Sequence, residues 1–438
     1  MLCLAVTLWS RGASGELPGV PGAEARPAAI AEETLANAEG SPPEGDVRFP
    51  QQVEPEVLES ESSRKWKVTP HVVLKTGFDD NIFISAQNRQ SDFFGVLSPG
   101  IAFGLGEFRQ HLKEFGSYAQ QYEDHPREEA VFFETRRFFF ANYTASAIAF
   151  VDHSEENAVD HDVSLAGRWT FQKLSLGFRA GLQTLSNSDI DVGGRVKRTI
   201  TDTEITARYE FSEKTSMEAN FSRLGLNYEQ ALDSTEWKNQ NWVNYRVFPK
   251  TQLGVGLAVG RLEVDEGAVQ SFEQGLVRAH YLGTGKLSFD GELGVEFRQI
   301  EDHGGNRTTP IFALGATYSP FVATELSLRG SRRTLASASK AGENYVLTGV
   351  EGRIRQRFFQ RFYVSTATGY ERSAYESVDG RGEANRTDNV FFTRPSLEFD
   401  VTKWASMEVA YEFRENDSTN PGSGFTENLA TIQISTHY

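Results

Sequence analysis

Histidines beside acidic segments and one carboxylate-rich loop are the parts of this 438-residue chain best suited to acid–base or metal chemistry. A His/carboxylate site built across loops is one interpretation of these histidines, and solvated loop residues the other; they are His125, His153, His161 and His303. Asp79-Asp80-Asn81 supplies oxygen donors that calcium prefers, but further ligands are missing from the spacing. We therefore favour Asp and Asn side chains that cap their own turn, and predict no metal site.

Glycines and serines give no stronger catalytic signal. Gly254, Gly256 and Gly260 resemble a phosphate-binding loop, but no helix follows them, so small lumen-facing residues of a strand explain them better. No serine carries a nucleophile-elbow motif. We predict no catalytic residues and no cofactor, and keep a hydrolase site assembled from separate strands as the less favoured alternative.

Charge and composition exclude several classes of protein. The chain has 44 Lys and Arg against 60 Asp and Glu, a net charge of −16, whereas nucleic-acid binding needs a basic face. No apolar run is long enough for a membrane-spanning helix. The single cysteine, Cys3, excludes an internal disulfide framework and a cysteine-based zinc site.

From residue 67 onward, apolar and polar residues alternate with a period of two. In the segment 286–298, KLSFDGELGVEFR, Leu293 and Val295 share one face and Glu296 lies on the other. Segments 161–171 and 405–414 repeat the pattern. Successive residues of a strand point to opposite faces, so each segment has one apolar and one charged face.

The lengths of strands and loops favour a membrane barrel over a soluble sandwich. The segments run for about 10 to 14 residues, whereas soluble strands average about 5 to 6 and a membrane strand needs about 9 to 11. Short turns, among them 140–142 and 172–173, alternate with long polar loops, among them 123–129 and 187–197. We predict that 67–438 forms one all-β, antiparallel up-and-down barrel of about 20 strands, with 18 as the alternative. The first strand, near 67–78, should pair with the last, near 426–438.

Aromatic residues flank the predicted short turns, as expected for a girdle at one membrane interface. The girdle comprises Phe171, Phe211, Phe248, Tyr281, Phe321, Phe358 and Phe399. Four prolines, at positions 70, 99, 310 and 395, lie inside strand segments, where the missing N–H should leave the ladder bulged or unpaired. Tyr438 ends an alternating strand and resembles the C-terminal signal by which bacterial outer-membrane barrels are recognised for insertion.

The charged face of the strands should point inward, because an arginine facing lipid at mid-depth costs about 2 to 4 kcal/mol. The side chains assigned to the lumen are Arg168, Arg179, Arg208, Glu210, Asp290, Glu292, Glu296, Arg298, Glu408, Glu412 and Arg414. Such a lumen is either wet or filled by a plug. Cross-strand ion pairs that only stabilise the wall are the structural alternative.

The N-terminal residues differ from the rest. Residues 1–15 hold a short apolar run followed by Ala13-Ser14-Gly15, which resembles the end of a signal peptide that lacks its basic start. Residues 16–66 hold 11 acidic and 4 basic residues and are rich in proline, so we predict a disordered tail. On a membrane barrel this tail would be periplasmic, as a docking element or as a passive leader.

The opening hairpin carries a family resemblance. Residues 70–105 resemble the first hairpin of a family of β-barrel porins of Gram-negative outer membranes that often accompany exopolysaccharide genes. The shared elements are Gly77, Phe78, Asp79, Asp80 and Asn81, with Ile82-Phe83 and Ser91-Asp92 after them, and then Ser98, Pro99 and Gly100. The resemblance implies an outer-membrane location and a part in polysaccharide export.

These observations together predict a porin-like channel with a polar, charged lumen. The alternative is a non-transporting scaffold that partners an envelope or polysaccharide-export machine. The expected partners are outer-membrane lipids, the barrel-assembly machinery and polysaccharide-export components, with no nucleic acid.

Overall fold

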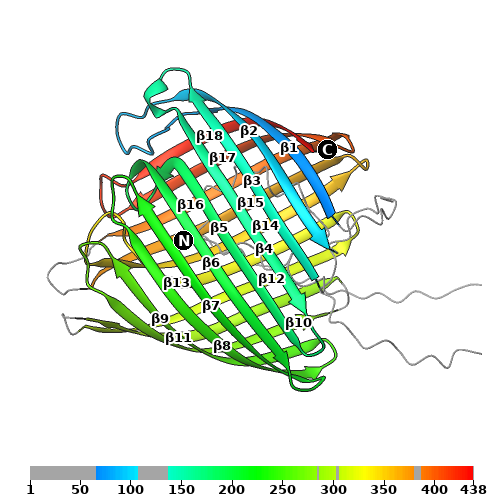
Figure 1. Cartoon of the computed structure of the whole chain (residues 1–438). Helices are drawn as coiled ribbons and strands as arrows, with labels where there is room; N and C mark the ends of the chain where they lie inside the picture. The colour runs from blue at the N-terminus through cyan, green and yellow to red at the C-terminus, as the bar shows by residue number, and fades with distance from the viewer. Residues whose placement is uncertain (1–65, 107–136, 284–285, 302–304, 379–385, 438) are drawn as a thin grey trace, which may run out of the picture. The chain divides into compact units, whose positions relative to one another are not determined.

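The computed structural model describes residues 66–106, 137–283, 286–301, 305–378 and 386–437, all within one compact unit, Arg48–Tyr438. They form an antiparallel sheet of 18 strands and one 3₁₀ turn, η3 (Ser154–Glu156) (Figure 1). Among these residues, no helix is long and apolar enough to cross a membrane. The strands are β1 (Trp66–Asp79), β2 (Asp92–Gly106), β3 (Arg137–Phe150), β4 (Ala158–Thr170), β5 (Leu174–Asp189), β6 (Gly194–Glu210), β7 (Thr215–Tyr228), β8 (Ser234–Phe248), β9 (Thr251–Val264), β10 (Gln270–Leu282), β11 (Leu287–Ile300), β12 (Asn306–Phe321), β13 (Thr324–Ala336), β14 (Glu343–Phe358), β15 (Phe362–Ser377), β16 (Thr387–Thr402), β17 (Ala405–Ser418) and β18 (Phe425–His437).

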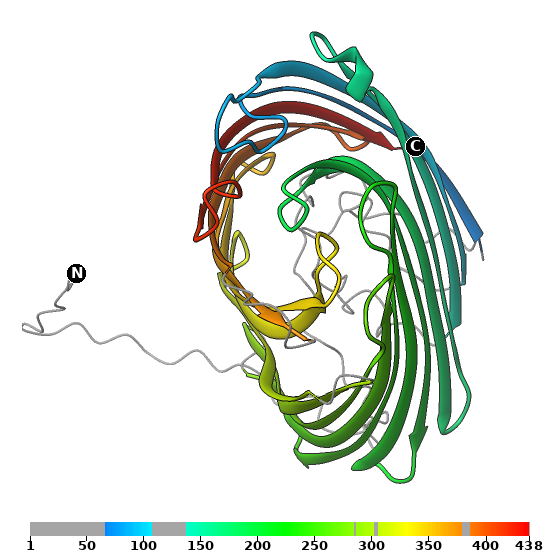
Figure 2. The same cartoon turned by 90° about the vertical axis from the view of Figure 1, so that its left-hand side faces the viewer.

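The sheet closes on itself. Each strand pairs with its neighbours in the sequence, and β1 also pairs with β18, from His71 opposite His437 to Asp79 opposite Leu429. Figure 2 shows the resulting ring of strands. The predicted closed barrel and the predicted pairing of its first and last strands are therefore confirmed.

The predicted count of 20 strands is wrong for the described residues, which form the alternative number, 18. The turn expected at 140–142 lies inside β3, where Phe140 faces Gly104 of β2 and Ala166 of β4. The long loop expected at 187–197 is mostly strand, since Ser188 pairs with Arg195. Polar composition misled both expectations, because these strands stay paired where their residues are polar. The loop expected at 123–129 lies outside the described residues.

The prolines mark places where ladders break, as predicted. Pairing between β2 and β3 skips Pro99, since it runs from Leu97 opposite Ala147 directly to Gly100 opposite Thr144. Pairing between β16 and β17 likewise skips Pro395. Pro70 lies just outside the β1–β18 pairing, which begins at His71. Because proline lacks an N–H, it can take no donor position in these ladders.

At the fourth proline the wall itself divides. β12 pairs with β11 up to Asn306, but it pairs with β13 only between Phe312 opposite Arg332 and Phe321 opposite Thr324. Strand β13 continues to pair with β14 as far as Ala336. On the loop side of Phe312, next to Pro310, no ladder joins the β13–β14 hairpin to β12. The hairpin can therefore bend away from the wall. We call this place the split.

The inner face of the barrel as the candidate functional site

Side-chain exposure distinguishes the two faces of the wall. On β9, Val255 is 65% exposed, whereas Ala258, on the opposite face, is 2% exposed. The buried face also carries contacts between strands that are not neighbours, such as that between Arg278 of β10 and Glu218 of β7. In a closed barrel such contacts run through the interior, so this face is the inner one.

The eleven charged side chains that the sequence assigns to the lumen all lie at strand positions opposite the exposed apolar ones. On β11, for example, Leu293, Val295 and Phe297 are exposed, and Glu292 and Glu296 alternate with them. The same holds on β4 for Arg168, on β5 for Arg179, on β6 for Arg208 and Glu210, on β11 also for Asp290 and Arg298, and on β17 for Glu408, Glu412 and Arg414.

Many of these charges are paired along the wall. Arg179 on β5 lies 2.9 Å from Glu204 on β6, and its guanidinium also approaches Asp202. Arg394 on β16 lies 3.2 Å from Glu408 and 3.8 Å from Glu412 on β17. Both signs of charge therefore alternate on the inner surface, and a solute inside would meet polar groups without one dominant charge.

Four further pairs involve the charged residues of the inner face. Arg414 contacts Glu412 at 3.7 Å and is hydrogen-bonded to Glu427 of β18. Arg208 lies 3.9 Å from Glu210. Asp290 is hydrogen-bonded to His280, which the sequence had not singled out.

A glycine-lined stretch of β9 receives large side chains from its neighbours. A Cβ atom at Gly256 would lie 2.6 Å from the ring of Trp242 on β8, so only glycine leaves room for this indole. The guanidinium of Arg278 covers the same ring, with its carbon 4.3 Å from the ring centroid. Gly254, Gly256 and Gly260 are thus small inner-face residues, as the sequence predicts.

A deeply buried ion pair lies near the split. Glu296 and Arg298 of β11 are 2.9 Å apart, and each is 3% exposed. Gln274 donates to Glu296 at 2.8 Å, and Arg298 donates to the side-chain oxygen of Gln270 at 3.1 Å. Burial of this pair is tolerable because the remaining polar atoms of both groups find hydrogen-bond partners.

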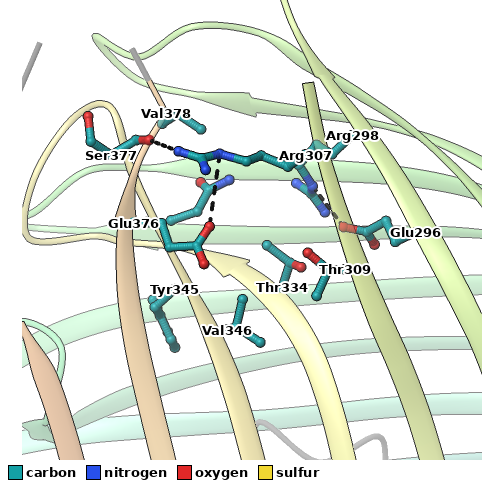
Figure 3. A pocket seen from close by; sticks show the side chains of 11 residues that line it. Glu296, Arg298, Arg307, Thr309, Thr334, Tyr345, Val346, Glu376, Ser377 and Val378 are labelled. Carbon is teal, nitrogen blue, oxygen red and sulfur yellow. Dashed lines mark hydrogen bonds and ion pairs between the residues drawn. The ribbon is translucent and has the colours of Figure 1, made fainter. Parts of the chain in front are cut away.

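Above the split, β13 to β15 pack against the inside of β10 to β12. Gln270 of β10 and Asn344 of β14 exchange two amide hydrogen bonds, of 3.1 and 2.7 Å. Asn344 and Val350 lie on the same face of β14, and Val350, further along the strand, is exposed on the outside of the barrel. At Asn344 this face is buried against the inner surface of the wall. Figure 3 shows Arg307 of β12 reaching Ser377 and Glu376 of β15 in the same pocket.

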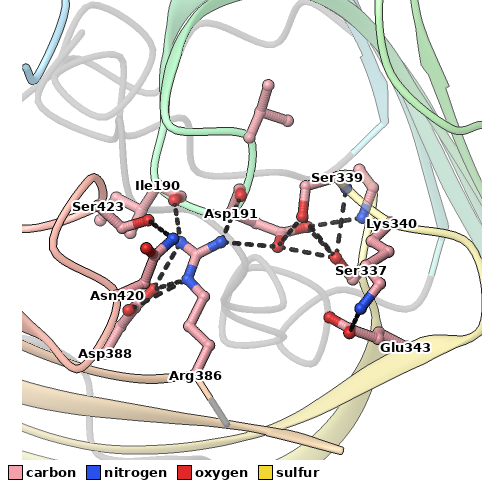
Figure 4. Close-up of polar contacts among 12 residues, drawn as sticks. Ile190, Asp191, Ser337, Ser339, Lys340, Glu343, Arg386, Asp388, Asn420 and Ser423 are labelled. Carbon is pink, nitrogen blue, oxygen red and sulfur yellow. Dashed lines mark hydrogen bonds and ion pairs between the residues drawn. The ribbon is translucent and has the colours of Figure 1, made fainter. Parts of the chain in front are cut away.

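Sequence reasoning missed a second group of inward residues, at the loop end of the barrel, which we call the mouth. Asp191 lies in the turn between β5 and β6, and its carboxylate accepts hydrogen bonds from the Ser337 hydroxyl at 2.9 Å and the Ala338 N–H at 2.6 Å. The Ser339 hydroxyl donates to it at 3.2 Å. Ser337, Ala338 and Ser339 form the tip of the β13–β14 hairpin. We call the contact between these two tips the clasp (Figure 4).

The clasp is joined by a third element. Arg386, just before β16, donates to the carbonyl oxygens of Ile190 at 2.7 Å and Asp191 at 2.9 Å, and pairs with Asp388 at 2.7 Å (Figure 4). Burial, together with the nearby carboxylate of Asp189, raises the pKa of Asp191 above its usual value. No local sequence motif indicates the clasp, because Asp191 and Ser337 are 146 residues apart in the sequence.

The motif residues of the first hairpin have structural surroundings. Asn81 is fully buried and donates to the carbonyl oxygens of Ser85 and Thr426. The carboxylate of Asp80 accepts two hydrogen bonds of 2.7 Å from Asn428 of β18. These contacts close the β1–β18 seam at the mouth, so the oxygen atoms considered for calcium are engaged with the protein.

The other motif residues pack the wall beneath the seam. Ser98 and Ser146 are hydrogen-bonded at 2.8 Å, across the ladder that Pro99 interrupts. A Cβ atom at Gly100 would lie 2.2 Å from the imidazole of His71. Gly77 similarly leaves room for the ring of Phe94 on β2, and Phe78 and Asp79 end β1 beside Leu429 and Ala430.

The girdle residues cluster at the short-turn end. Six of the seven are exposed on the outer surface, namely Phe171, Phe211, Phe248, Tyr281, Phe321 and Phe358. Phe399 is partly buried and stacks on Phe362, with the ring centroids 4.5 Å apart. Tyr438 lies outside the described residues.

The histidines do not gather into one site within the described residues. Nδ1 of His153 donates to the Asp92 carboxylate at 2.8 Å, and its Nε2 lies 2.7 Å from the side-chain oxygen of Gln90. Asp92 also accepts backbone N–H groups of the loop that holds His153, which is an anchoring role. His161 contacts the hydroxyl of Tyr143, and no group of three or more potential metal ligands occurs among the described residues. His125 and His303 lie outside them.

Comparison with known proteins gives architectural likeness only. No family model matches the chain, and no curated protein matches it. The outer-membrane protein OpdK of Pseudomonas aeruginosa has a TM-score of 0.44 at 10% identity, with 85% of this chain and 99% of that chain covered. OccK2 (OpdF) of the same organism has a TM-score of 0.45 at 10% identity, with 85% and 98% covered. The FrpB iron transporter of Neisseria meningitidis has a TM-score of 0.41 at 10% identity, with 81% and 62% covered. At this degree of likeness, function has to be inferred from the chain's own residues.

Proposed function

We propose that this protein is a porin-like channel of a Gram-negative outer membrane that admits polar solutes. One observation carries the proposal: a closed 18-stranded barrel exposes large apolar side chains on its outer face and turns charged side chains inward. In water this distribution is unfavourable, whereas in a bilayer it places apolar groups against lipid and polar groups in the lumen. Barrels of 16 to 18 strands are wide enough for an aqueous channel.

The outer surface supports one orientation in the membrane. The short-turn end carries the aromatic girdle, whereas exposed charged residues of the outer face, such as Lys197, Arg261 and Glu263, lie near the mouth. Strands of 13 to 17 residues exceed the roughly 9 to 11 needed to cross a bilayer, and their excess is polar. We infer that the short turns are periplasmic and the mouth extracellular. Trp66 begins β1 at the short-turn end, so the predicted tail would join the barrel from the periplasm.

The second candidate is a barrel that carries no solute and serves as a partner in an envelope or polysaccharide-export machine. The clasp across the mouth and the paired charges of the wall favour it, because both would also occur in a closed, purely structural barrel. The link to polysaccharide export depends on the resemblance of residues 70–105 alone. Lipids of the outer membrane and the assembly machinery for such barrels are the partners common to both candidates.

Conductance separates the two candidates. Purified, folded protein in planar bilayers should give stepwise currents, and proteoliposomes should swell in isotonic solutions of small sugars. Heat-denatured protein from the same preparation serves as the control for detergent artefacts. Protein that is shown to be inserted and folded, yet gives neither current nor swelling, would reject the channel and favour the structural barrel.

A further inference from the structure

Two hairpins from opposite sides of the barrel meet at the mouth. Strands β5 and β14 are as far apart as the circular order of 18 strands allows, yet the β5–β6 tip contacts the β13–β14 tip. Figure 2 shows both tips inside the ring of strands. A contact between opposite walls must lie across the route that a solute would follow through the mouth.

The β13–β14 tip can reach the centre because of the split. Since β13 stops pairing with β12 above Arg332, its upper residues are not held in the wall. The outward face of the hairpin is stabilised instead by the inner wall, through Asn344 and Gln270. The inward position of this tip is therefore supported along its length by hydrogen bonds, as well as by the clasp at its end.

A single carboxylate holds the two tips together. Asp191 is 8% exposed and receives three donors from Ser337, Ala338 and Ser339. Apolar packing contributes little here, since the facing tip consists of two serines and one alanine. Removal of the carboxylate would leave buried donors without acceptors, which they could recover only by moving apart into water.

We propose that Asp191 determines the size limit of the channel by tying the two tips across the mouth. This inference rests on the proposed channel function and assigns the residue that determines its size selectivity. The permeating class consists of small polar solutes that pass beside the closed clasp, and larger ones enter only when the tips separate. Arg386 supports the closed state by holding the backbone of Ile190 and Asp191.

The test compares wild type with Asp191→Ala in proteoliposomes and planar bilayers. Swelling rates are measured with uncharged sugars from monosaccharide to tetrasaccharide, which separates size from charge. Asp191→Ala should increase single-channel conductance and shift the size limit toward larger sugars. The matched control is Asp265→Ala, an exposed carboxylate in the β9–β10 loop at the same mouth, which should behave as wild type.

A variant with a reducible disulfide tests the closed and the open clasp in the same folded protein, so that misfolding cannot explain the difference. Asp191→Cys with Ser337→Cys, in a Cys3→Ser background, places one thiol on each tip, where the native side chains are 2.9 Å apart. Oxidised protein should keep the wild-type size limit, and reduction should shift that limit as Asp191→Ala does. Equal size limits before and after reduction would overturn the clasp as the selectivity device.

The outcomes separate the two proposals. If wild type and Asp191→Ala conduct equally, the clasp does not limit passage, and the channel itself stands. If wild type is silent and Asp191→Ala conducts, the clasp closes the mouth entirely, which contradicts passage beside the closed clasp and overturns the size-limit role of Asp191. If all folded variants are silent, the channel is rejected and the inference with it.

Discussion

The guanidinium of Arg332 donates a 3.1 Å hydrogen bond to the backbone carbonyl of Pro310, where β12 and β13 cease to pair. A second donor of the same side chain reaches the Thr348 hydroxyl of β14 at 2.8 Å. Arg332 thus replaces part of a missing ladder and connects three strands at the edge of the split. A wall that opens here without a substitute donor would leave an unsatisfied carbonyl close to lipid.

Arg332→Met should destabilise the folded barrel. The substitution removes two hydrogen bonds and leaves the Pro310 carbonyl without its donor, which costs about 1 to 3 kcal/mol. Equilibrium unfolding in urea, with folded protein in lipid vesicles, measures the loss. Arg372→Met is the control, because Arg372 lies on β15 opposite the same Thr348 and is exposed. Equal losses for the two variants would contradict the role of Arg332.

Gly256→Ala should also be destabilising, by about 1 to 3 kcal/mol, because the added methyl group would overlap the indole of Trp242. Gly275→Ala on the adjacent β10 is the matched control, since no atom lies within 4 Å of its added Cβ. Both are measured by the same unfolding experiment. The double variant Gly256→Ala/Trp242→Leu should recover part of the loss; no recovery would indicate a backbone effect instead of a clash with the ring.

Acidification should favour the closed clasp. In the closed state the pKa of Asp191 is raised, whereas in an open mouth the solvated carboxyl would return to about 3.9. The closed state therefore binds a proton more tightly, and this stabilisation is lost as pH rises through the raised pKa. The charged and titratable groups that face Asp191 are Asp189, Tyr375, Arg386 and Asp388.

We expect single-channel conductance to fall when the extracellular side is acidified from about pH 7 toward the free-carboxyl pKa of about 3.9. Asp191→Asn cannot titrate and should lose this dependence, while Asp265→Ala should keep it. A pH response that persists unchanged in Asp191→Asn would assign the titration to another group.

Removal of β18 should abolish assembly. Deletion of 429–438 removes every β18 partner of β1 and most of those of β17, so one edge of each strand is left unpaired, and each unpaired backbone group costs several kcal/mol in lipid. Deletion of 16–60, the predicted disordered tail, should leave assembly intact. The readout is the resistance of the folded barrel to heat and to protease in outer-membrane fractions. Heat-resistant protein from the 429–438 deletion would argue against closure through β18.

Local pattern was enough to predict the faces of the strands. The period of two alone places Leu293 and Glu296 on opposite faces, because successive side chains of a strand alternate. The breaks at Pro99 and Pro395 were likewise predicted from the missing N–H. Both features depend on residues adjacent in the sequence, which is where sequence reasoning is strongest.

The mouth could not be predicted in the same way. Ser188 and Arg195 are polar, so composition favours a loop here, although the two residues pair across a tight hairpin. The clasp depends on a turn folding inward to meet a tip from the opposite wall, and the tip depends on the split beside Pro310. Composition carries no information about such long-range contacts, and only the folded barrel brings Asp191 to Ala338.

The seam also determines the order in which this chain can fold. Among the described strands every other pair joins sequence neighbours, so hairpins can form with little loss of loop entropy. The hydrogen bonds from Asn428 to Asp80 connect residues 348 positions apart, and this one step must wait until the final strand has been synthesised. Until then the sheet has two free edges, which can pair with any other strand nearby. The stage before the β1–β18 seam closes is therefore the one at which incorrect pairing of these two strands is easiest.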